Sequence, residues 1–229
     1  STGIGGDMFA LVWMAREQKL YALNGSGRAP AALNIREVKM RGAEDEIPLF
    51  GWLPVTVPGA VDGWSQLLHR FGNMSFDQVL APAIEYAEQG FPVTELIAAS
   101  FARRQPKLDM HPEAARIYLT HAQAPRVGQI LKQPDLGKSF RALAQDGRDA
   151  FYLGWIADEI AKYSYKSGGF ITKHDLENHT SAWEEPISTT YKDVTLYECP
   201  PNGQGIVALS ALNILQEFDF VEMEHNSAE

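Results

Sequence analysis

The sequence contains a single cysteine, Cys199, and no long uninterrupted apolar stretch. One cysteine cannot form a disulfide within the chain, and it says little about the compartment, because many exported enzymes also lack disulfides. The longest apolar run, residues 206–215, is broken by Ser210 and Asn213 and is far shorter than the ~20 residues of a membrane span. The sequence therefore predicts a protein without a transmembrane segment.

Basic residues are also scarce. Lysine and arginine number 20 against 29 aspartates and glutamates, and the formal net charge is -9. Binding to nucleic acid requires clustered lysine and arginine that neutralise phosphates, and no basic stripe is present. We therefore expect no nucleic-acid partner. With 229 residues and 45% hydrophobic content, the chain is long enough for one large domain or two small ones.

The usual sequence signatures of a nucleophile are missing as well. No Gly-x-Ser-x-Gly elbow occurs, because Gly25-Ser26-Gly27 has the wrong flanking residues. Cys199 precedes two prolines and has no identifiable histidine partner nearby, so we expect a buried thiol instead of a reactive one. The sequence predicts that this chain holds no complete catalytic centre and no catalytic residue.

Patterns for a metal or a nucleotide are equally weak. The glycines of residues 3–7 open a strand, whereas a dinucleotide-binding loop follows a strand and opens a helix. Of the six histidines only His174 and His179 lie close, and a spacing of five does not place both on one helix face. We interpret them as surface histidines and expect neither a metal nor an organic cofactor.

Hydrophobic periodicity predicts a chain of mixed helices and strands, that is, the α/β (α+β) class. The aromatic side chains of Phe151, Tyr152 and Trp155 are expected to pack internally, and Ser227 is a candidate cap for a further helix start. Residues 106–125, with three prolines, are expected to be irregular surface. Strands are expected at 8–13, 19–23, 54–61, 187–191 and 194–197, and helices at 62–71, 77–89, 94–104, 135–146, 150–166, 172–178 and 206–217.

A glycine-rich corner follows the second expected strand, at residues 24–30 (Asn-Gly-Ser-Gly-Arg-Ala-Pro). Two glycines suit a chain that passes close to a ligand or to a second backbone, and a disordered linker is the alternative. An arginine in such a corner, Arg28, can hold a carboxylate through two parallel hydrogen bonds. The other interpretation of Arg28 is a solvated surface arginine.

Several motifs together resemble one family, and they keep its order along essentially the whole chain. They are residues 1–9 (Ser-Thr-Gly-Ile-Gly-Gly-Asp-Met-Phe), 28–32 (Arg-Ala-Pro-Ala-Ala), 57–64 (Val-Pro-Gly-Ala-Val-Asp-Gly-Trp), 80–93, 149–154, 168–172, the Pro-Ile-Ser run from Pro186, and Cys-Pro-Pro-Asn-Gly-Gln-Gly at 199–205. In this pattern the sequence resembles the large subunit of gamma-glutamyltransferases.

The resemblance implies an N-terminal-nucleophile hydrolase with a four-layer αββα sandwich, incomplete in this chain. Such proteins are made as precursors that cleave themselves and free a threonine, which acts as nucleophile with its own amine as base. Thr180, Thr189 and Thr190 sit in the wrong motifs for that role. We therefore expect residues 1–229 to be a partial large-subunit domain that lacks the N-terminal helical segment and the small subunit, and that is inactive alone.

One departure from the family pattern concerns the substrate. The family carries an arginine three residues before the Ala-Pro pair, where it binds the alpha-carboxylate of the glutamyl group, and this chain has Ser26 there. Arg28 lies two positions on, and in an extended backbone residues 26 and 28 point to the same side. Ser26 and Arg28 are therefore the candidate substrate-binding residues. Their pattern resembles the transferase-like and cephalosporin-acylase-like branch of the family.

The resemblance thus implies an amide hydrolase or acyltransferase that works through an acyl-enzyme on a threonine outside this chain. Its expected partners are the small subunit of the same precursor and a small-molecule gamma-glutamyl or glutaryl amide. Two alternatives stay open: a cephalosporin (glutaryl) acylase, and a non-catalytic binding or scaffold domain. The compartment also stays open, either cytoplasmic or periplasmic and secreted.

Overall fold

The computed structural model describes residues 3–43, 45–220 and 223, so the candidate cap Ser227 lies outside the described part. The chain forms two compact units. Unit 1 comprises the residues up to Arg70 and those from Tyr152 onward, and unit 2 comprises Phe71–Phe151. No helix in the described ranges is long and apolar enough to cross a membrane.

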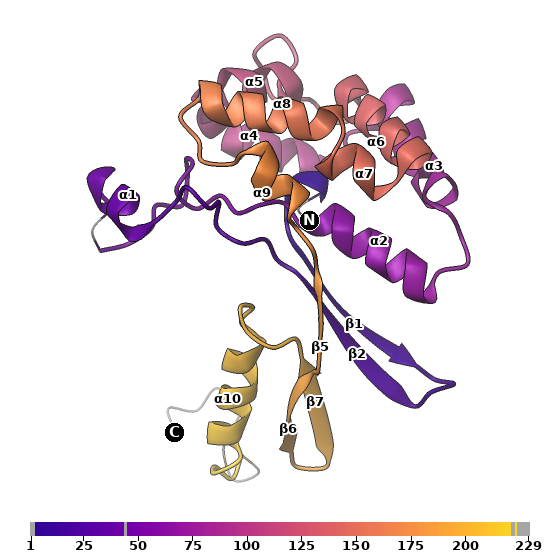
Figure 1. Cartoon of the computed structure of the whole chain (residues 1–229), viewed down its shortest axis with the longest axis vertical. Coiled ribbons are helices and arrows are strands. Elements are labelled where there is room, and N and C mark those ends of the chain that lie inside the picture. The colour runs from indigo at the N-terminus through magenta and orange to yellow at the C-terminus, as the bar shows by residue number, and fades with distance from the viewer. Residues whose placement is uncertain (1–2, 44, 221–222, 224–229) are drawn as a thin grey trace. The chain divides into compact units, whose positions relative to one another are not determined.

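A three-stranded antiparallel sheet organises unit 1, with the order β1-β2-β5. Strands β1 (Met8–Met14) and β2 (Lys19–Gly25) form the predicted hairpin, in a register that pairs Met8 with Gly25. Strand β5 (Ala182–Glu184) adds to the other edge of β2, and the three strands lie side by side in Figure 1. The sequence pattern did not predict β5, because three residues are too few to show an alternation.

A second hairpin in unit 1 consists of β6 (Ile187–Tyr191) and β7 (Val194–Glu198), which the sequence also predicts. Helix α10 (Gly205–Leu215) packs along this hairpin (Figure 1). Strand β7 is joined to α10 by residues 199–205, which include the first residue of α10 and which we call the elbow. The elbow brings Asn202 back to the end of β2, where its side chain meets that of Asn24.

The remaining helices of unit 1 are short. They are a 3-10 turn η1 (Gly3–Gly5), α1 (Ile35–Met40), α2 (Ala60–Phe71, whose last residue enters unit 2), α8 (Trp155–Lys166) and α9 (Lys173–Glu177).

The expected helix at 150–166 is wrong, because α7 (Arg148–Tyr152) ends before α8 begins. Gly154 adopts an extended backbone (φ -85, ψ -164) at the N-cap of α8 and thereby separates the two helices. Glycine weakens a continuous helix because it loses the most backbone freedom on ordering. Phe151 and Tyr152 are buried as predicted, but Trp155, at the start of α8, is 40% exposed.

Unit 2 is helical and centres on the packing of α3 (Phe76–Gln89) against α6 (Pro134–Asp146). The contact buries apolar side chains of both helices, Leu80, Ile84, Ala87 and Leu143. The short strands β3 (Phe91–Pro92) and β4 (Ile130–Leu131) pair with each other. Both main helices agree with the sequence periodicity.

The expectation of irregular structure at 106–125 is wrong in its first half. Helix α4 (Glu95–Asp109) runs through Pro106, and α5 (Pro112–Tyr118) follows after two residues. Pro106 lies in the last turn of α4, and Pro112 is the first residue of α5, where its missing N–H would have no intrahelical partner. Proline is therefore compatible with both helices at these positions.

The segment from Val55 to Gly59 forms neither a helix nor the strand that the sequence predicted. Its backbone bonds go to loop segments instead of a ladder: Val57 N–H donates to the Arg28 carbonyl at 3.0 Å, and Gly59 N–H donates to the Gly6 carbonyl at 3.1 Å. The alternating pattern is therefore wrong about a strand here, because the backbone partners of this segment are loops and not a neighbouring strand.

The glycine-rich corner lies directly against this segment. A Cβ on Gly27 would stand 1.6 Å from the carbonyl oxygen of Val57, and a Cβ on Gly59 would stand 2.0 Å from that of Gly25. No side chain fits at either contact. The corner is therefore an ordered segment in close contact with a second backbone, and not a disordered linker.

A network of buried polar groups stabilises the segment at 55–59 that contacts the glycine-rich corner. The Tyr152 hydroxyl, which is fully buried, donates to the Pro58 carbonyl at 2.8 Å and accepts from the Asp62 N–H at 3.1 Å. The Asp62 carboxylate, which is 2% exposed, accepts from the Ser181 N–H at 2.6 Å. The network therefore joins the start of α2, the end of α7 and the chain that enters β5.

We predict that Tyr152→Phe lowers the free energy of unfolding by about 1–3 kcal/mol, because it leaves the buried Pro58 carbonyl and Asp62 N–H without this partner. The measurement is chemical denaturation. Tyr165→Phe is the matched control: Tyr165 is 87% exposed, and removal of its hydroxyl should change the stability by no more than about 0.5 kcal/mol. Equal stability of the two variants would contradict the role given to the Tyr152 hydroxyl.

Candidate functional site

A cavity of about 520 Å³ in unit 1 is the candidate site. The end of β2, the glycine-rich corner, α9, the start of β5 and the elbow form its walls. Its lining residues are Asn24, Ser26, Gly27, Arg28, Ala29, Ala31, Val57, His174, Asp175, Asn178, His179, Thr180, Ala182, Glu184 and Asn202. We call it the corner cavity. Its polar lining and the predicted residues that it contains make it the place to look for ligand chemistry.

Both predicted substrate-binding residues, Ser26 and Arg28, line the corner cavity. Gly27 and Val57, whose backbones are in close contact, line the same cavity. The Arg28 side chain is exposed, and within the described part of the chain no hydrogen bond or ion pair engages its guanidinium group. Arg28 therefore offers an unused bidentate donor on the wall of the cavity.

Ser26 differs from Arg28 because neighbouring residues already engage its polar atoms. Its hydroxyl accepts from Asn202 Nδ2 at 2.7 Å and donates to Asp7 Oδ2 at 3.4 Å. Its N–H donates to Asn24 Oδ1 at 3.0 Å. These bonds fix the shape of the corner, so Ser26 has less hydrogen-bonding capacity left for a ligand than Arg28.

Two asparagines connect the strand end to the elbow. Asn24 Nδ2 donates to Asn202 Oδ1 at 3.1 Å and to Glu184 Oε2 at 3.3 Å. Sequence reasoning did not single out Asn24, Asn202, Glu184 or Asp7. Asn24 lies in the glycine-rich corner and Asn202 in the motif at 199–205, but nothing in the sequence indicates that residues 178 positions apart touch.

The two neighbouring histidines also reach this cavity, and one prediction about them is wrong. His179 is only 7% exposed and stacks on Tyr152, with ring centroids 5.4 Å apart, instead of lying on the surface. The chain turns inward after the buried Leu176, whose carbonyl accepts from the His179 N–H. His174 is exposed. Across the described ranges no group of three or more His, Cys, Asp or Glu side chains is placed to hold a metal ion.

Asp175 lines the cavity, but its carboxylate is bonded to backbone N–H groups of the protein. Its carboxylate accepts from the N–H groups of Ala31 and Thr172, both at 2.8 Å, and caps α9 together with the Thr172 hydroxyl. Burial acts to raise the pKa of Asp175, but these hydrogen bonds and the nearby His174 outweigh it and hold the pKa below its usual range. Asp175 therefore stays ionised, and its hydrogen-bonding capacity is largely used.

Cys199 in the elbow is half-buried, and its thiol lies 3.8 Å from the Ala10 carbonyl oxygen. Burial, followed by the charges of Glu198 and Glu184, raises the pKa of Cys199 above that of an ordinary thiol. The thiolate is the reactive form, so a raised pKa makes this residue a poor nucleophile. The geometry favours the predicted interpretation of a structural thiol.

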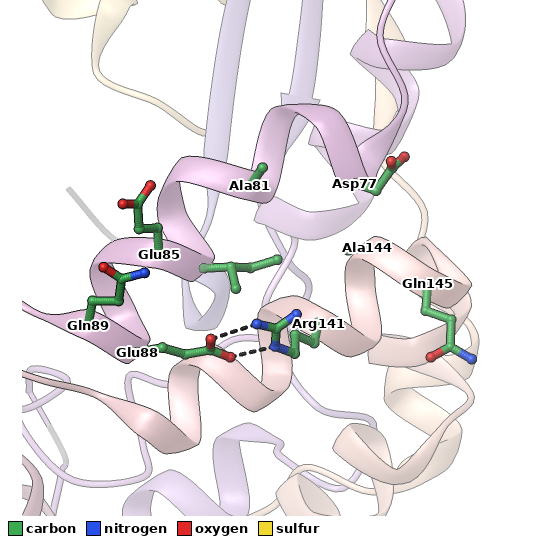
Figure 2. A pocket seen from close by; sticks show the side chains of 9 residues that line it. Asp77, Ala81, Glu85, Glu88, Gln89, Arg141, Ala144 and Gln145 are labelled. Carbon is green, nitrogen blue, oxygen red and sulfur yellow. Dashed lines mark hydrogen bonds and ion pairs between the residues drawn. The ribbon is translucent and has the colours of Figure 1, made fainter.

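Unit 2 has a hollow of its own, of about 610 Å³, along α3 and α6 (Figure 2). Arg141 Nε donates to Glu88 Oε1 at 2.5 Å and Arg141 Nη2 to Glu88 Oε2 at 2.6 Å, so the pair ties the two helices together. The hydrogen bond from Arg141 is the main cause that lowers the pKa of Glu88. Because Arg141 is already paired with Glu88, this hollow is a weaker candidate for an anionic ligand than the corner cavity.

The corner cavity therefore presents an arginine to a possible anionic ligand, and no nucleophile paired with a base is found among its described lining residues. Arg28 matches the geometry of a carboxylate, and the backbone beside it is rigidly held. Among the described lining residues, Thr180 and Ser26 carry hydroxyls, and neither lies at a chain start where an amine could act as its base.

Comparison with known proteins gives a family and close structural neighbours. The family model described as gamma-glutamyltranspeptidase matches residues 1–229. The chain is 36% identical over 229 residues to the glutathione hydrolase-like YwrD proenzyme of Bacillus subtilis, and covers 100% of itself and 43% of that protein. It is 32% identical to the oxamate amidohydrolase proenzyme of Klebsiella pneumoniae, with 97% of this chain and 42% of that protein covered. The chain thus spans less than half the length of these relatives.

Solved structures that are similar to this chain agree with the family match. The crystal structure of cephalosporin acylase from Bacillus halodurans superposes with a TM-score of 0.91 at 41% identity, over 97% of this chain and 42% of that one. Helicobacter pylori gamma-glutamyltranspeptidase gives a TM-score of 0.89 at 26% identity, over 98% of this chain and 65% of that one. These neighbours confirm the predicted fold class: mixed helices and strands of the N-terminal-nucleophile hydrolase fold.

The ion pair between Arg141 and Glu88 in unit 2 allows a test of how Arg141 affects the pKa of Glu88. We predict that Arg141→Gln raises the pKa of Glu88 toward its ordinary value, and NMR titration of the Glu88 carboxyl carbon measures it. Because the folded pKa is depressed, the stability that the pair contributes is present above the unfolded pKa and is lost as pH falls through the folded pKa. Arg104→Gln, at an exposed arginine of α4, is the control. An unchanged Glu88 titration in Arg141→Gln contradicts the assignment.

Proposed function

The chain belongs to the gamma-glutamyltranspeptidase family, and from that premise we propose that it is part of an amide hydrolase or acyltransferase whose acyl group carries a carboxylate. The observation behind the proposal is Arg28, an arginine without a protein partner in the described part, on the wall of a polar cavity. A guanidinium group binds a carboxylate through two parallel hydrogen bonds, which fix both its position and its orientation.

The chemistry itself belongs to residues outside these 229. We propose a threonine nucleophile at the start of a small subunit, with its own amine as base, which forms an acyl-enzyme. The threonines of this chain do not fit that role: Thr189 and Thr190 lie within β6, where their hydroxyls bond to Asn213 and to Thr195. On this proposal the fragment is inactive alone, and the small subunit also supplies the donors that stabilise the tetrahedral intermediate.

The relatives support a precursor that is cleaved into two subunits. Both relatives described above are named proenzymes, and both are more than twice as long as the segment that this chain matches. We propose that the chain is the larger part of the corresponding large subunit and forms a heterodimer with the small subunit after self-cleavage. Self-cleavage and acyl transfer would then use the same threonine.

We propose a gamma-glutamyl amide as substrate, and a glutaryl amide as the second candidate. The second rests on the similarity to cephalosporin acylase, at 41% identity. Both acyl groups end in a carboxylate that Arg28 can hold, and they differ in the ammonium group that only the gamma-glutamyl group carries. Turnover of a gamma-glutamyl anilide against that of a glutaryl anilide, with the assembled protein, separates the two candidates.

Arg28→Ala in the assembled two-subunit protein should raise KM about 10- to 100-fold for the preferred carboxylate-bearing anilide, because hydrogen bonds to a charged group contribute about 1.5–3 kcal/mol. Arg28→Lys should recover only part of the loss, since lysine cannot bind bidentately. Arg36→Ala, at an exposed arginine of α1, is the control and should leave KM unchanged. If KM is the same in Arg28→Ala and in the wild type, Arg28 does not hold the acyl carboxylate.

Expression of the full-length precursor tests the nucleophile. We expect mass spectrometry to find two polypeptides, and a new N-terminal threonine on the smaller one. Replacement of that threonine by alanine should leave one uncut chain without amidase activity. A single uncut polypeptide from the wild-type gene would instead favour the alternative of a non-catalytic binding or scaffold domain.

A further inference from the structure

The direction of the Arg28 side chain depends on a backbone that contains two glycines. Gly25 and Gly27 flank Ser26, and an isolated chain of this composition would adopt many conformations. Because no described side chain bonds to the guanidinium group, only the backbone and the walls of the cavity set where Arg28 points. The contacts that hold the backbone of the glycine-rich corner therefore determine where Arg28 points in the proposed carboxylate site.

One carboxylate, that of Asp7, holds the corner at two points. Asp7 Oδ1 accepts from the Gly27 N–H at 3.1 Å, and Asp7 Oδ2 accepts from the Ser26 hydroxyl at 3.4 Å. The first bond fixes the peptide group between residues 26 and 27. The peptide group that follows Arg28 is held separately, because the Arg28 carbonyl accepts from the Val57 N–H at 3.0 Å. Arg28 is thus fixed on both sides, by Asp7 before it and by Val57 after it.

Asp7 is itself placed by its two neighbours. The carbonyl of Gly6 accepts from the N–H groups of Gly59 and Ala60 at the start of α2. Met8 opens β1 and pairs with Gly25 at the end of β2. Asp7 is not among the residues that line the corner cavity, so it acts on the corner and not on a ligand directly.

From this geometry we infer that Asp7 is a positioning residue: it aims Arg28 into the corner cavity and so sets the affinity for the acyl carboxylate. The inference rests on the proposed function, because it concerns the same site. A merely structural aspartate would change the stability of the whole unit. A positioning aspartate changes KM for substrates that Arg28 binds, and it does so only through Arg28.

A double-mutant cycle in the assembled two-subunit protein tests this, with the gamma-glutamyl or glutaryl anilide that it turns over as substrate. Asp7→Ala should raise KM about five- to tenfold and change kcat less than twofold, because both contacts of the Asp7 carboxylate to the corner are lost. In the Arg28→Ala background the same substitution should raise KM no further, since contacting groups are non-additive. Asp7→Asn, which keeps an oxygen acceptor for the Gly27 N–H, should restore most of the affinity.

Three controls make the outcome decisive. Asp193→Ala, in the exposed turn between β6 and β7, should leave KM unchanged. Thermal unfolding of each variant reports whether the fold is intact, and Asp7→Glu, which displaces the carboxylate by one methylene, takes the place of Asp7→Ala if that variant does not assemble. An Asp7→Ala effect that persists fully in the Arg28→Ala background, or an unchanged KM in Asp7→Ala, overturns the positioning role. If Arg28→Ala itself leaves KM unchanged, the proposed carboxylate site fails first, and the inference fails with it.

Discussion

The close contact between the glycine-rich corner and the segment at 55–59 is the constraint on which the rest of unit 1 depends. Two carbonyl groups, those of Val57 and Gly25, occupy the space where side chains of Gly27 and Gly59 would be. Backbones approach this closely only where neither residue has a Cβ. Gly27 and Val57 also line the corner cavity, so the glycine contact forms part of its wall.

Buried hydrogen bonds keep the contact in one arrangement. A buried carboxylate such as that of Asp62 is costly unless it is hydrogen-bonded, and the Ser181 N–H supplies such a bond. The Tyr152 hydroxyl uses both its donor and its acceptor capacity on the backbone around Pro58. These groups lie under the corner cavity, and His179 stacks on Tyr152 at its edge. The same network therefore holds the fold and shapes the site, which is why its members are polar although they are buried.

The sequence predicted the parts of the fold in which local periodicity decides the structure. Both hairpins, α3, α6 and α10 were predicted within a few residues, because their apolar positions repeat with the period of a strand or a helix. The misses have physical causes. β5 has three residues, and its strand character comes from pairing with β2. The break between α7 and α8 depends on one glycine, and residues 55–59 bond to loops instead of a neighbouring strand. His179 is buried by its neighbours in space, which no local pattern records.

Local sequence patterns do not record contacts between distant residues. This limit distinguishes the residue that we propose to bind a ligand from the residues that position it. Arg28 was singled out by the chemistry of arginine and its place in a glycine-rich stretch. The structure places it on the wall of the corner cavity, and its role in binding stays a prediction. Asp7 and Asn202 could not be singled out in this way, because their roles come from hydrogen bonds to Ser26 across 19 and 176 positions of sequence. A residue that contacts a ligand carries a chemical signal in its own side chain, whereas a residue that positions it does so only through contacts made by folding.

The charges around Arg28 bear on what the cavity can accept. The chain carries a net charge of -9, and Asp175 and Glu184 both line the cavity, so an anionic ligand approaches a largely acidic surface. Asp175 directs its carboxylate at backbone N–H groups, and Glu184 accepts from Asn24, so each acidic group is bonded to a neighbour that offsets part of its charge. Arg28 has no such neighbour in the described part of the chain. If Arg28 binds the acyl carboxylate as proposed, the pairing of these acids contributes to the selectivity as much as the arginine itself does.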